Sequence, residues 1–134
     1  MIATLKEVLQ AAEDKKIAIG AFDTPNLESL CAAIAAAEEV ELPTIIMHAQ
    51  CHESLCPLDV IGPIMVEHAK KAKVPVCVHL DHGDSFELCK SCIDGGFTSV
   101  MIDASHYDFE KNIEITKKVV EYAAAVGLAT NCTI

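Results

Sequence analysis

The sequence has 134 residues, of which 51% are hydrophobic, so it is long and apolar enough to form one domain with a packed core. Twenty acidic residues against ten basic ones give a net charge of −10, which argues against nucleic acid or an anionic membrane surface as a partner. No apolar run approaches the ~18 residues of a membrane span, and no export signal opens the chain, so we expect a cytoplasmic protein.

The first third of the chain predicts two helices and two strands. Thr4-Leu5-Lys6-Glu7 is a capping box, which marks the start of a helix. Asn26 is a typical N-cap residue, and apolar residues recur behind it at helical spacing. The expected elements are, in order, a helix at 4–15, a buried strand at 17–22, a helix at 26–37 and a strand at 43–48.

The rest of the chain alternates in the same way. Pro63 suits the first turn of a helix, where its missing amide hydrogen is not needed. Asp84 or Ser85 is the expected cap of a later helix, and Asp108 caps the longest one. The expected elements are, in order, a loop at 51–57, a helix from 63 to about 72, a strand at 74–81, a helix at 85–94, a strand at 99–103, a helix at 108–125 and the beginning of a strand at 128–134.

Strands that are separated by single helices indicate βαβ units and a parallel sheet. The predicted units repeat about every 28 residues, and eight of them would approach the typical size of a (β/α)₈ barrel. We therefore expect an α/β fold in which parallel (βα) units form the first half of a TIM (β/α)₈ barrel, truncated after the start of the fifth strand. Residues 1–134 would form this one partial barrel domain.

The seven cysteines are expected to be reduced thiols, because the sequence shows no signal for export to an oxidising compartment. Cys89 and Cys92 form a C-x-x-C pair, a spacing that redox and zinc sites use. No second pair accompanies it. We therefore favour a structural role in a helix, and a redox module is the alternative.

Polar residues gather at the predicted strand ends, where a (β/α)₈ barrel places its catalytic groups. The densest cluster is His79-Leu80-Asp81-His82-Gly83, in which strand alternation puts His79 and Asp81 on the inner face. An Asp beside a metal-binding His suits proton transfer near a Lewis acid, although a hydrogen-bonded network without a metal fits the pattern as well. Asp103 ends the next strand and either reaches the same site or accepts hydrogen bonds from the amides that follow it.

The segment Val-Pro-Val-Cys-Val-His-Leu-Asp-His-Gly at 74–83 resembles the first signature of the class II, zinc-dependent fructose/tagatose-bisphosphate aldolases. Residues 5–9 and 18–22 are similar to the opening of that family. Residues 96–105, with Asn112 and Thr116, resemble its fourth strand and the helix behind it. The resemblance covers essentially the whole chain, which is identified as the N-terminal half of a family member.

The resemblance implies reversible, Zn²⁺-dependent cleavage of a fructose- or tagatose-type bisphosphate to dihydroxyacetone phosphate and an aldehyde phosphate, as in glycolysis. His82 matches a zinc ligand of the family, and Asp103 matches a carboxylate that some members use for a second metal. Asp81 matches the residue that moves a proton, and His79 has a supporting role. The other zinc ligands are expected beyond the end of this chain, and the full-length form is expected to be a homo-oligomer.

The sequence also departs from the family pattern. Asp23, a candidate substrate-binding residue, stands where many members have Asn, and Ala49 stands where a Ser or Thr lies near a substrate phosphate. The Glu-x-Glu pattern of the fifth strand is absent from residues 129–134. Two interpretations follow: an aldolase fragment that is inactive alone, and a non-catalytic half-barrel that binds a partner chain or a metal.

Overall fold

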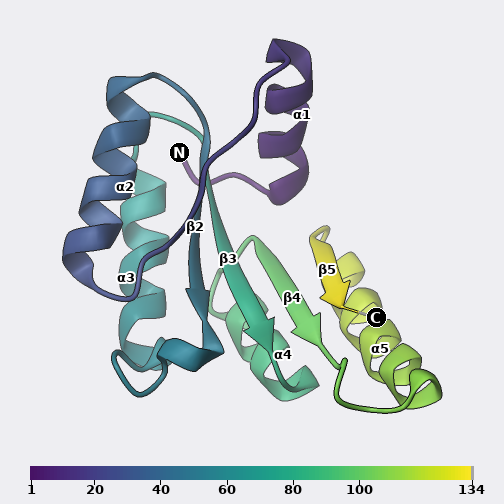
Figure 1. The fold of residues 1–134 in the computed structure, drawn as a ribbon. Helices are drawn as coiled ribbons and strands as arrows, with labels where there is room; N and C mark the ends of the chain where they lie inside the picture. The colour runs from purple at the N-terminus through teal and green to yellow at the C-terminus, as the bar shows by residue number, and fades with distance from the viewer. Residues whose placement is uncertain (134) are drawn as a thin grey trace.

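The computed structural model describes residues 1–133, whose five strands form one parallel sheet in the order β1-β2-β3-β4-β5 (Figure 1). Each strand is hydrogen-bonded to the next one along the chain, and the arrows in Figure 1 all point to the same end of the sheet. The strands are β1 (Ala21–Asp23), β2 (Thr44–Ala49), β3 (Val76–Gly83), β4 (Ser99–Asp103) and β5 (Ala129–Thr133). The predicted parallel (βα) repeat is confirmed.

Helices α2 to α5 follow the strands and pack on the outer face of the sheet, whereas α1 lies at the end where the strands begin (Figure 1). The helices are α1 (Leu5–Lys15), α2 (Leu27–Glu39), the short 3₁₀ helix η1 (Gln50–His52), α3 (Leu58–Lys71), α4 (Phe86–Asp94) and α5 (Phe109–Ala125). Within residues 1–133, no helix combines the length and the apolar character that crossing a membrane requires.

Side-chain caps determine where most of the helices begin. Thr4 and Glu7 form the predicted capping box of α1, in which each side chain bonds the backbone of the other residue. Asn26 Oδ1 accepts the amide hydrogen of Ser29 at 2.8 Å, and Asp108 Oδ1 accepts that of Lys111 at 2.9 Å. These local contacts explain why the starts of α1, α2 and α5 were predictable.

Three predicted elements differ clearly from the structure. The third strand was expected at 74–81, but β3 is Val76–Gly83 and so includes His82. The first strand was expected at 17–22, but β1 comprises only three exposed residues, because this edge strand pairs on one side and only Ala21–Asp23 align with β2. The third helix was expected to begin at Pro63, but α3 begins at Leu58. The Glu53 carboxylate, five residues earlier in the chain, accepts the Leu58 amide hydrogen at 3.0 Å and supports an earlier start, so Pro63 lies inside the helix. Ile134 of the predicted fifth strand lies outside the described residues.

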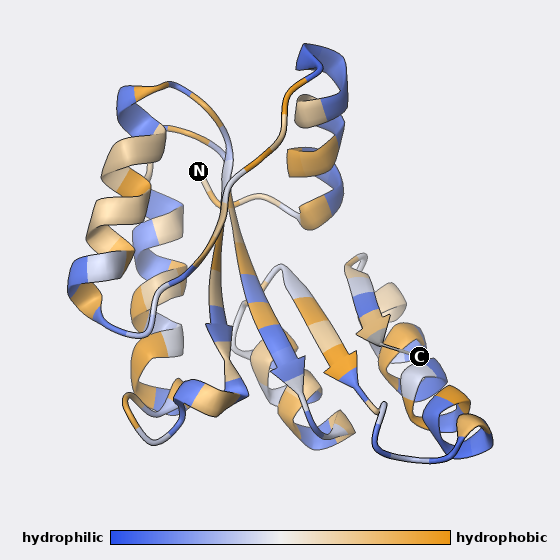
Figure 2. Ribbon diagram, in the orientation of Figure 1, coloured by the Kyte–Doolittle hydropathy of each residue, from blue (hydrophilic) through white to orange (hydrophobic). Residues whose placement is uncertain are grey.

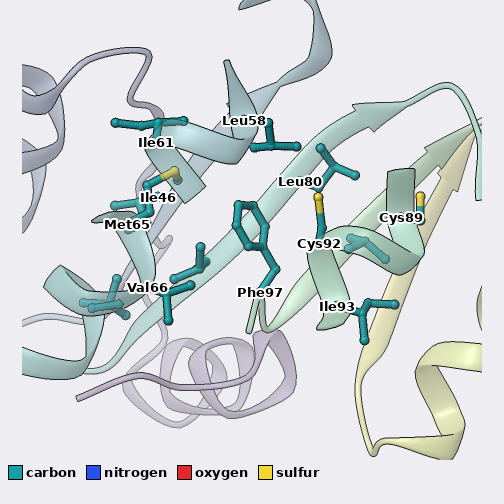
Figure 3. Packing of buried hydrophobic residues seen from close by; sticks show 14 of the residues in the cluster. Ile46, Leu58, Ile61, Met65, Val66, Leu80, Cys89, Cys92, Ile93 and Phe97 are labelled. Atoms are coloured by element: carbon teal, nitrogen blue, oxygen red, sulfur yellow. The ribbon is translucent and has the colours of Figure 1, made fainter. Parts of the chain in front are cut away.

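The main core lies between the outer face of the sheet and its helices (Figure 3). Ile46, Leu80 and Ile102 from the three central strands are fully buried there. Phe97, which precedes β4, packs against α3 at Gly62, where an added Cβ would lie only 3.2 Å from the Phe97 ring. This packing anchors α3 and α4 to the sheet and so holds the strand ends in place.

Replacing Phe97 with Ala is expected to lower the free energy of unfolding by about 3–5 kcal/mol, because the ring is 3% exposed and its loss leaves a cavity. Urea denaturation followed by circular dichroism measures the change. Phe109→Ala is the matched control, since that ring is 68% exposed and its removal should change stability by less than about 0.5 kcal/mol. Equal effects of the two substitutions would contradict the prediction.

Candidate functional site

A pocket of about 520 Å³ opens at the carboxyl end of the sheet. Its walls come from the segment after β2, from the end of β3 and from the β4–α5 loop. The polar side chains that line it are Gln50, Cys51, Asp81, His82, Asp84, Asp103, Ser105 and His106. Figure 2 shows the hydrophilic residues of β2 and β3 toward their arrowheads, as a parallel sheet with a site at its carboxyl end requires.

His82 and Asp103 pair across the ends of β3 and β4, with His82 Nδ1 2.8 Å from Asp103 Oδ2. Hydrogen bonds from the side chain and the amide of Ser105, followed by the one with His82, lower the pKa of Asp103 to about 2. The carboxylate is therefore ionised at neutral pH and only accepts hydrogen bonds. Nδ1 of His82 consequently carries the hydrogen of this bond, which leaves Nε2 as the nitrogen that faces away from Asp103.

Asp81 lies on the other side of the His82 ring. Its Oδ1 is 3.7 Å from His82 Nε2, which is longer than a hydrogen bond. Asp81 also lines a hollow of about 190 Å³ on the inner face of the sheet, together with His79. His79 Nδ1 lies 2.9 Å from Ser99 Oγ, and burial holds the pKa of His79 below its usual value. His79 is thus a neutral, fixed side chain beside Asp81.

An irregularity at the end of β3 directs His82 into the pocket. The pairing of β3 with β4 shifts register between Leu80 and Gly83, and His82 has a φ of 102°. Such a conformation costs a non-glycine residue about 1–3 kcal/mol and is concentrated at functional sites. A Cβ on Gly83 would lie 2.9 Å from Leu80 Cδ2 and 3.1 Å from Cys89 Sγ, so a residue without a side chain is needed behind His82.

Two other strand-end residues lie outside this pocket. Asp23 ends β1 at the same edge of the sheet and is not among the residues that line this pocket, but it lies close enough to His48 and His79 to act on their pKa values. His48 is fully buried, with its ring centroid 5.5 Å from that of His52. Burial, and then the neighbouring His52, hold the pKa of His48 below its usual value, so this side chain is neutral.

Gln50 and Asp84 are pocket residues that the sequence analysis did not identify. Gln50 directly follows β2, and Asp84 was considered only as a helix cap. Ser85 caps α4 instead, through its hydroxyl oxygen and the Leu88 amide, and Asp84 contacts Gln50. In the sequence, the position of each residue next to a strand end indicates that it could belong to the site. No sequence pattern indicates that the two side chains meet.

This pocket can supply one of the protein ligands that a metal site requires. His82 Nε2 is an open imidazole ligand, and the carboxylates of Asp81 and Asp103 lie beside the ring. A catalytic zinc takes three protein ligands and keeps a fourth position open. Among the residues that the structure describes, no group of three or more His, Cys, Asp or Glu side chains is arranged to hold a metal ion. The pocket can supply one imidazole and a proton-transfer carboxylate, and a complete site needs further ligands.

Cys89 and Cys92 lie on the buried face of α4, within the main core (Figure 3). Burial raises the pKa of each thiol to about 12. Both side chains are therefore protonated at neutral pH, whereas redox chemistry requires the thiolate. This burial supports the structural role of the C-x-x-C pair.

We expect iodoacetamide at pH 8 to label the exposed Cys31, Cys51 and Cys132 in the native chain and to leave Cys89 and Cys92 unlabelled until urea is added. Peptide mass spectrometry measures the labelling. The raised folded-state pKa of the two thiols also predicts a pH effect. Unfolding allows them to ionise at their ordinary pKa of 9.0, so stability should decline as the pH rises from about 9 toward 12. Rapid native labelling of either thiol would contradict this.

Comparisons with known proteins agree on one family. The family model described as "Fructose-bisphosphate aldolase class-II" matches residues 3–132. The fructose-bisphosphate aldolase of Geobacillus stearothermophilus is 42% identical over 138 residues, and that of Staphylococcus epidermidis is 41% identical over 136 residues. Each alignment covers 99% of this chain but 47% and 48% of the relative, so the chain spans about half the length of the curated relatives it matches.

The solved structures show the same partial coverage. The crystal structure of the YdjI aldolase from Escherichia coli K12 is similar with a TM-score of 0.90 and 36% sequence identity, over 98% of this chain and 52% of that one. Fructose-bisphosphate aldolase from Campylobacter jejuni has a TM-score of 0.77 at 24% identity and therefore supports the fold alone. A five-stranded parallel sheet that covers about half of such structures is consistent with half of a TIM barrel.

Proposed function

This chain belongs to the class II fructose-bisphosphate aldolase family, and we propose that it forms the half of a ketose-bisphosphate aldolase that carries Asp81 and His82. The substrate would be a fructose- or tagatose-type bisphosphate, and the products dihydroxyacetone phosphate and an aldehyde phosphate. The observation that carries this proposal is the arrangement of Asp103, His82 and Asp81 in one pocket at the carboxyl ends of β3 and β4.

Zn²⁺ is the proposed cofactor, and when bound it would polarise the substrate carbonyl as a Lewis acid. His82 would be a ligand through Nε2, since Asp103 already engages Nδ1. Asp103 would act through His82, because its Oδ1 accepts the Ser105 amide hydrogen at 3.1 Å while its Oδ2 holds the imidazole. The remaining ligands would come from outside residues 1–134.

Asp81 would hold and move the proton of the substrate hydroxyl. Its side chain is 25% exposed, which leaves it accessible from the pocket, and it lies close to the ligand nitrogen of His82. A carboxylate at this place accepts the hydroxyl proton during cleavage and returns it to the aldehyde oxygen during condensation. Because the pocket is open, a second segment would be needed to exclude water and to hold the substrate phosphates.

We further propose that the protein works in the cytoplasm and that its full-length form self-associates. All seven cysteines are free thiols, as expected in a reducing compartment. The apolar side chains of Phe109, Ile113 and Val120 are exposed on α5, and an apolar surface of this kind favours contact with another subunit.

A hybrid chain tests the proposed function. In this hybrid, residues 1–134 are followed by the second half of the Geobacillus relative, which supplies the region that the alignment leaves uncovered. We expect the hybrid to cleave fructose or tagatose bisphosphate in the presence of Zn²⁺ and to lose activity when a chelator is added. A folded hybrid that retains Zn²⁺ and cleaves neither substrate would contradict the proposed function.

A further inference from the structure

Gln50 connects two loops of the candidate site through a single side chain. Its Oε1 accepts the backbone amide hydrogen of Asp84 at 2.8 Å, and its Nε2 donates to Asp84 Oδ2 at 2.5 Å. Gln50 lies at the start of η1, directly after β2, and Asp84 directly follows β3. Their separation of 34 positions along the chain makes this a tertiary contact that joins the ends of two neighbouring strands.

The bridge lies next to the strained part of β3. His82 has the positive φ described above, and Asp84 is only two residues further along the chain. An unfavourable backbone conformation persists only where the surrounding structure over-determines it. The two sides of this segment are held differently: Asp103 on β4 holds the His82 ring, and Gln50 on the β2 side holds the backbone and the side chain of Asp84.

The backbone and the exposed side chains of this segment are held in different ways. Gly83 packs against Leu80 and Cys89, which anchors the backbone behind His82. The His82 side chain is 45% exposed, so hydrogen bonds orient it and the neighbouring Asp84 side chain. Gln50 suits the task because an amide both donates and accepts, so it satisfies the Asp84 carboxylate and the Asp84 amide together.

We propose that Gln50 is a positioning residue of the aldolase reaction: by bridging Asp84, it holds the Asp81–His82 segment in the geometry that the reaction needs. This inference rests on the proposed function. Gln50 itself need not touch the reacting atoms. Its effect is exerted through the loop, and a displacement of about 1 Å in a catalytic group is enough to lower a rate substantially.

A charge-conserving exchange tests the bridge. Gln50→Glu removes the donor to the Asp84 side chain and places a second carboxylate against Asp84. Repulsion between the two carboxylates then separates the side chains and weakens the bond to the Asp84 amide as well. Adding Asp84→Asn restores a donor and an acceptor with the roles reversed, at the same total charge. In the hybrid chain, we expect Gln50→Glu to lower kcat about 10- to 100-fold with a smaller change in KM, and the double variant to recover most of the loss.

Amide hydrogen exchange gives a readout that does not depend on activity. In the 134-residue chain, the Asp84 amide should exchange at least about tenfold faster in Gln50→Glu than in the wild type and should slow again in the double variant. Gln10→Glu is the matched control, because Gln10 Nε2 donates to Asp14 Oδ1 at 2.9 Å on α1, far from the pocket along the chain. This substitution should change neither the kcat nor the exchange of the Asp84 amide.

The outcomes separate this inference from the proposed function. Full activity of the Gln50→Glu hybrid, or a loss that the double variant does not recover, would overturn the positioning role. An inactive wild-type hybrid would overturn the proposed function, and the catalytic role of Gln50 with it. In that case, the exchange of the Asp84 amide still shows whether the bridge exists, and unchanged exchange in Gln50→Glu would exclude the bridge as well.

Discussion

Replacing Asp81 with Asn in the hybrid aldolase is expected to lower kcat by about 10²- to 10⁴-fold, which is the usual contribution of a general acid–base group. Asn has nearly the same shape but cannot accept and return a proton. KM should change much less, because the substitution leaves the pocket and its other hydrogen bonds in place. Steady-state kinetics with saturating Zn²⁺ and fructose bisphosphate measure both constants.

Asp59→Asn is the matched control for this prediction. Asp59 is an exposed carboxylate in the first turn of α3, outside the pocket, so its loss should leave kcat within about twofold of the wild type. Thermal unfolding of both variants shows whether the fold is intact. A correctly folded Asp81→Asn hybrid that keeps more than a tenth of the wild-type kcat would remove Asp81 from the proposed proton transfer.

The 134-residue chain alone is expected to show no measurable cleavage, even with Zn²⁺ added. The described residues contain no group of three or more potential ligands arranged for a metal, where a catalytic zinc requires three protein ligands, so metal binding should be weak and easily reversed by a chelator. Isothermal titration with Zn²⁺ and an aldol-cleavage assay measure the two effects. The second half of the Geobacillus relative, supplied as a separate chain, should restore activity.

A variant control distinguishes restored activity from contamination. Activity that returns with the second half should disappear in His82→Ala, since that substitution removes the only imidazole ligand proposed for this chain. Robust turnover by the 134-residue chain alone, abolished by His82→Ala, would contradict the prediction and would mean that self-association completes the site. Binding of the second half without turnover would favour the alternative interpretation, a half-barrel that binds a partner chain.

Local sequence signals account for most of the secondary structure. Each helix cap contacts a residue only three positions away along the chain, so it can be recognised without knowledge of the fold. This holds for the capping box at Thr4–Glu7 and for the N-caps Asn26 and Asp108. The strand at 99–103 was predicted with its observed bounds, because it is a continuous apolar run bounded by turn residues. The alternation of such elements indicated a parallel α/β sheet.

The convergence of Asp81, His82 and Asp103 also followed from the sequence in outline. In a parallel sheet, the carboxyl ends of neighbouring strands lie at one edge, so residues that end β3 and β4 must come close together. In the structure, the ends of β3 and β4 meet through the hydrogen bond between His82 and Asp103. The side-chain geometry supports the proposal that Asp103 acts through His82.

Only the tertiary structure decided the details that depend on contacts between distant residues. The short β1 depends on its place at the edge of the sheet. The positive φ of His82 and the Gln50–Asp84 bridge arise where segments from different strands meet. The sequence by itself determined the elements and their order, because caps and periodicity act over a few residues. The geometry of the site depends on side chains that only folding brings together.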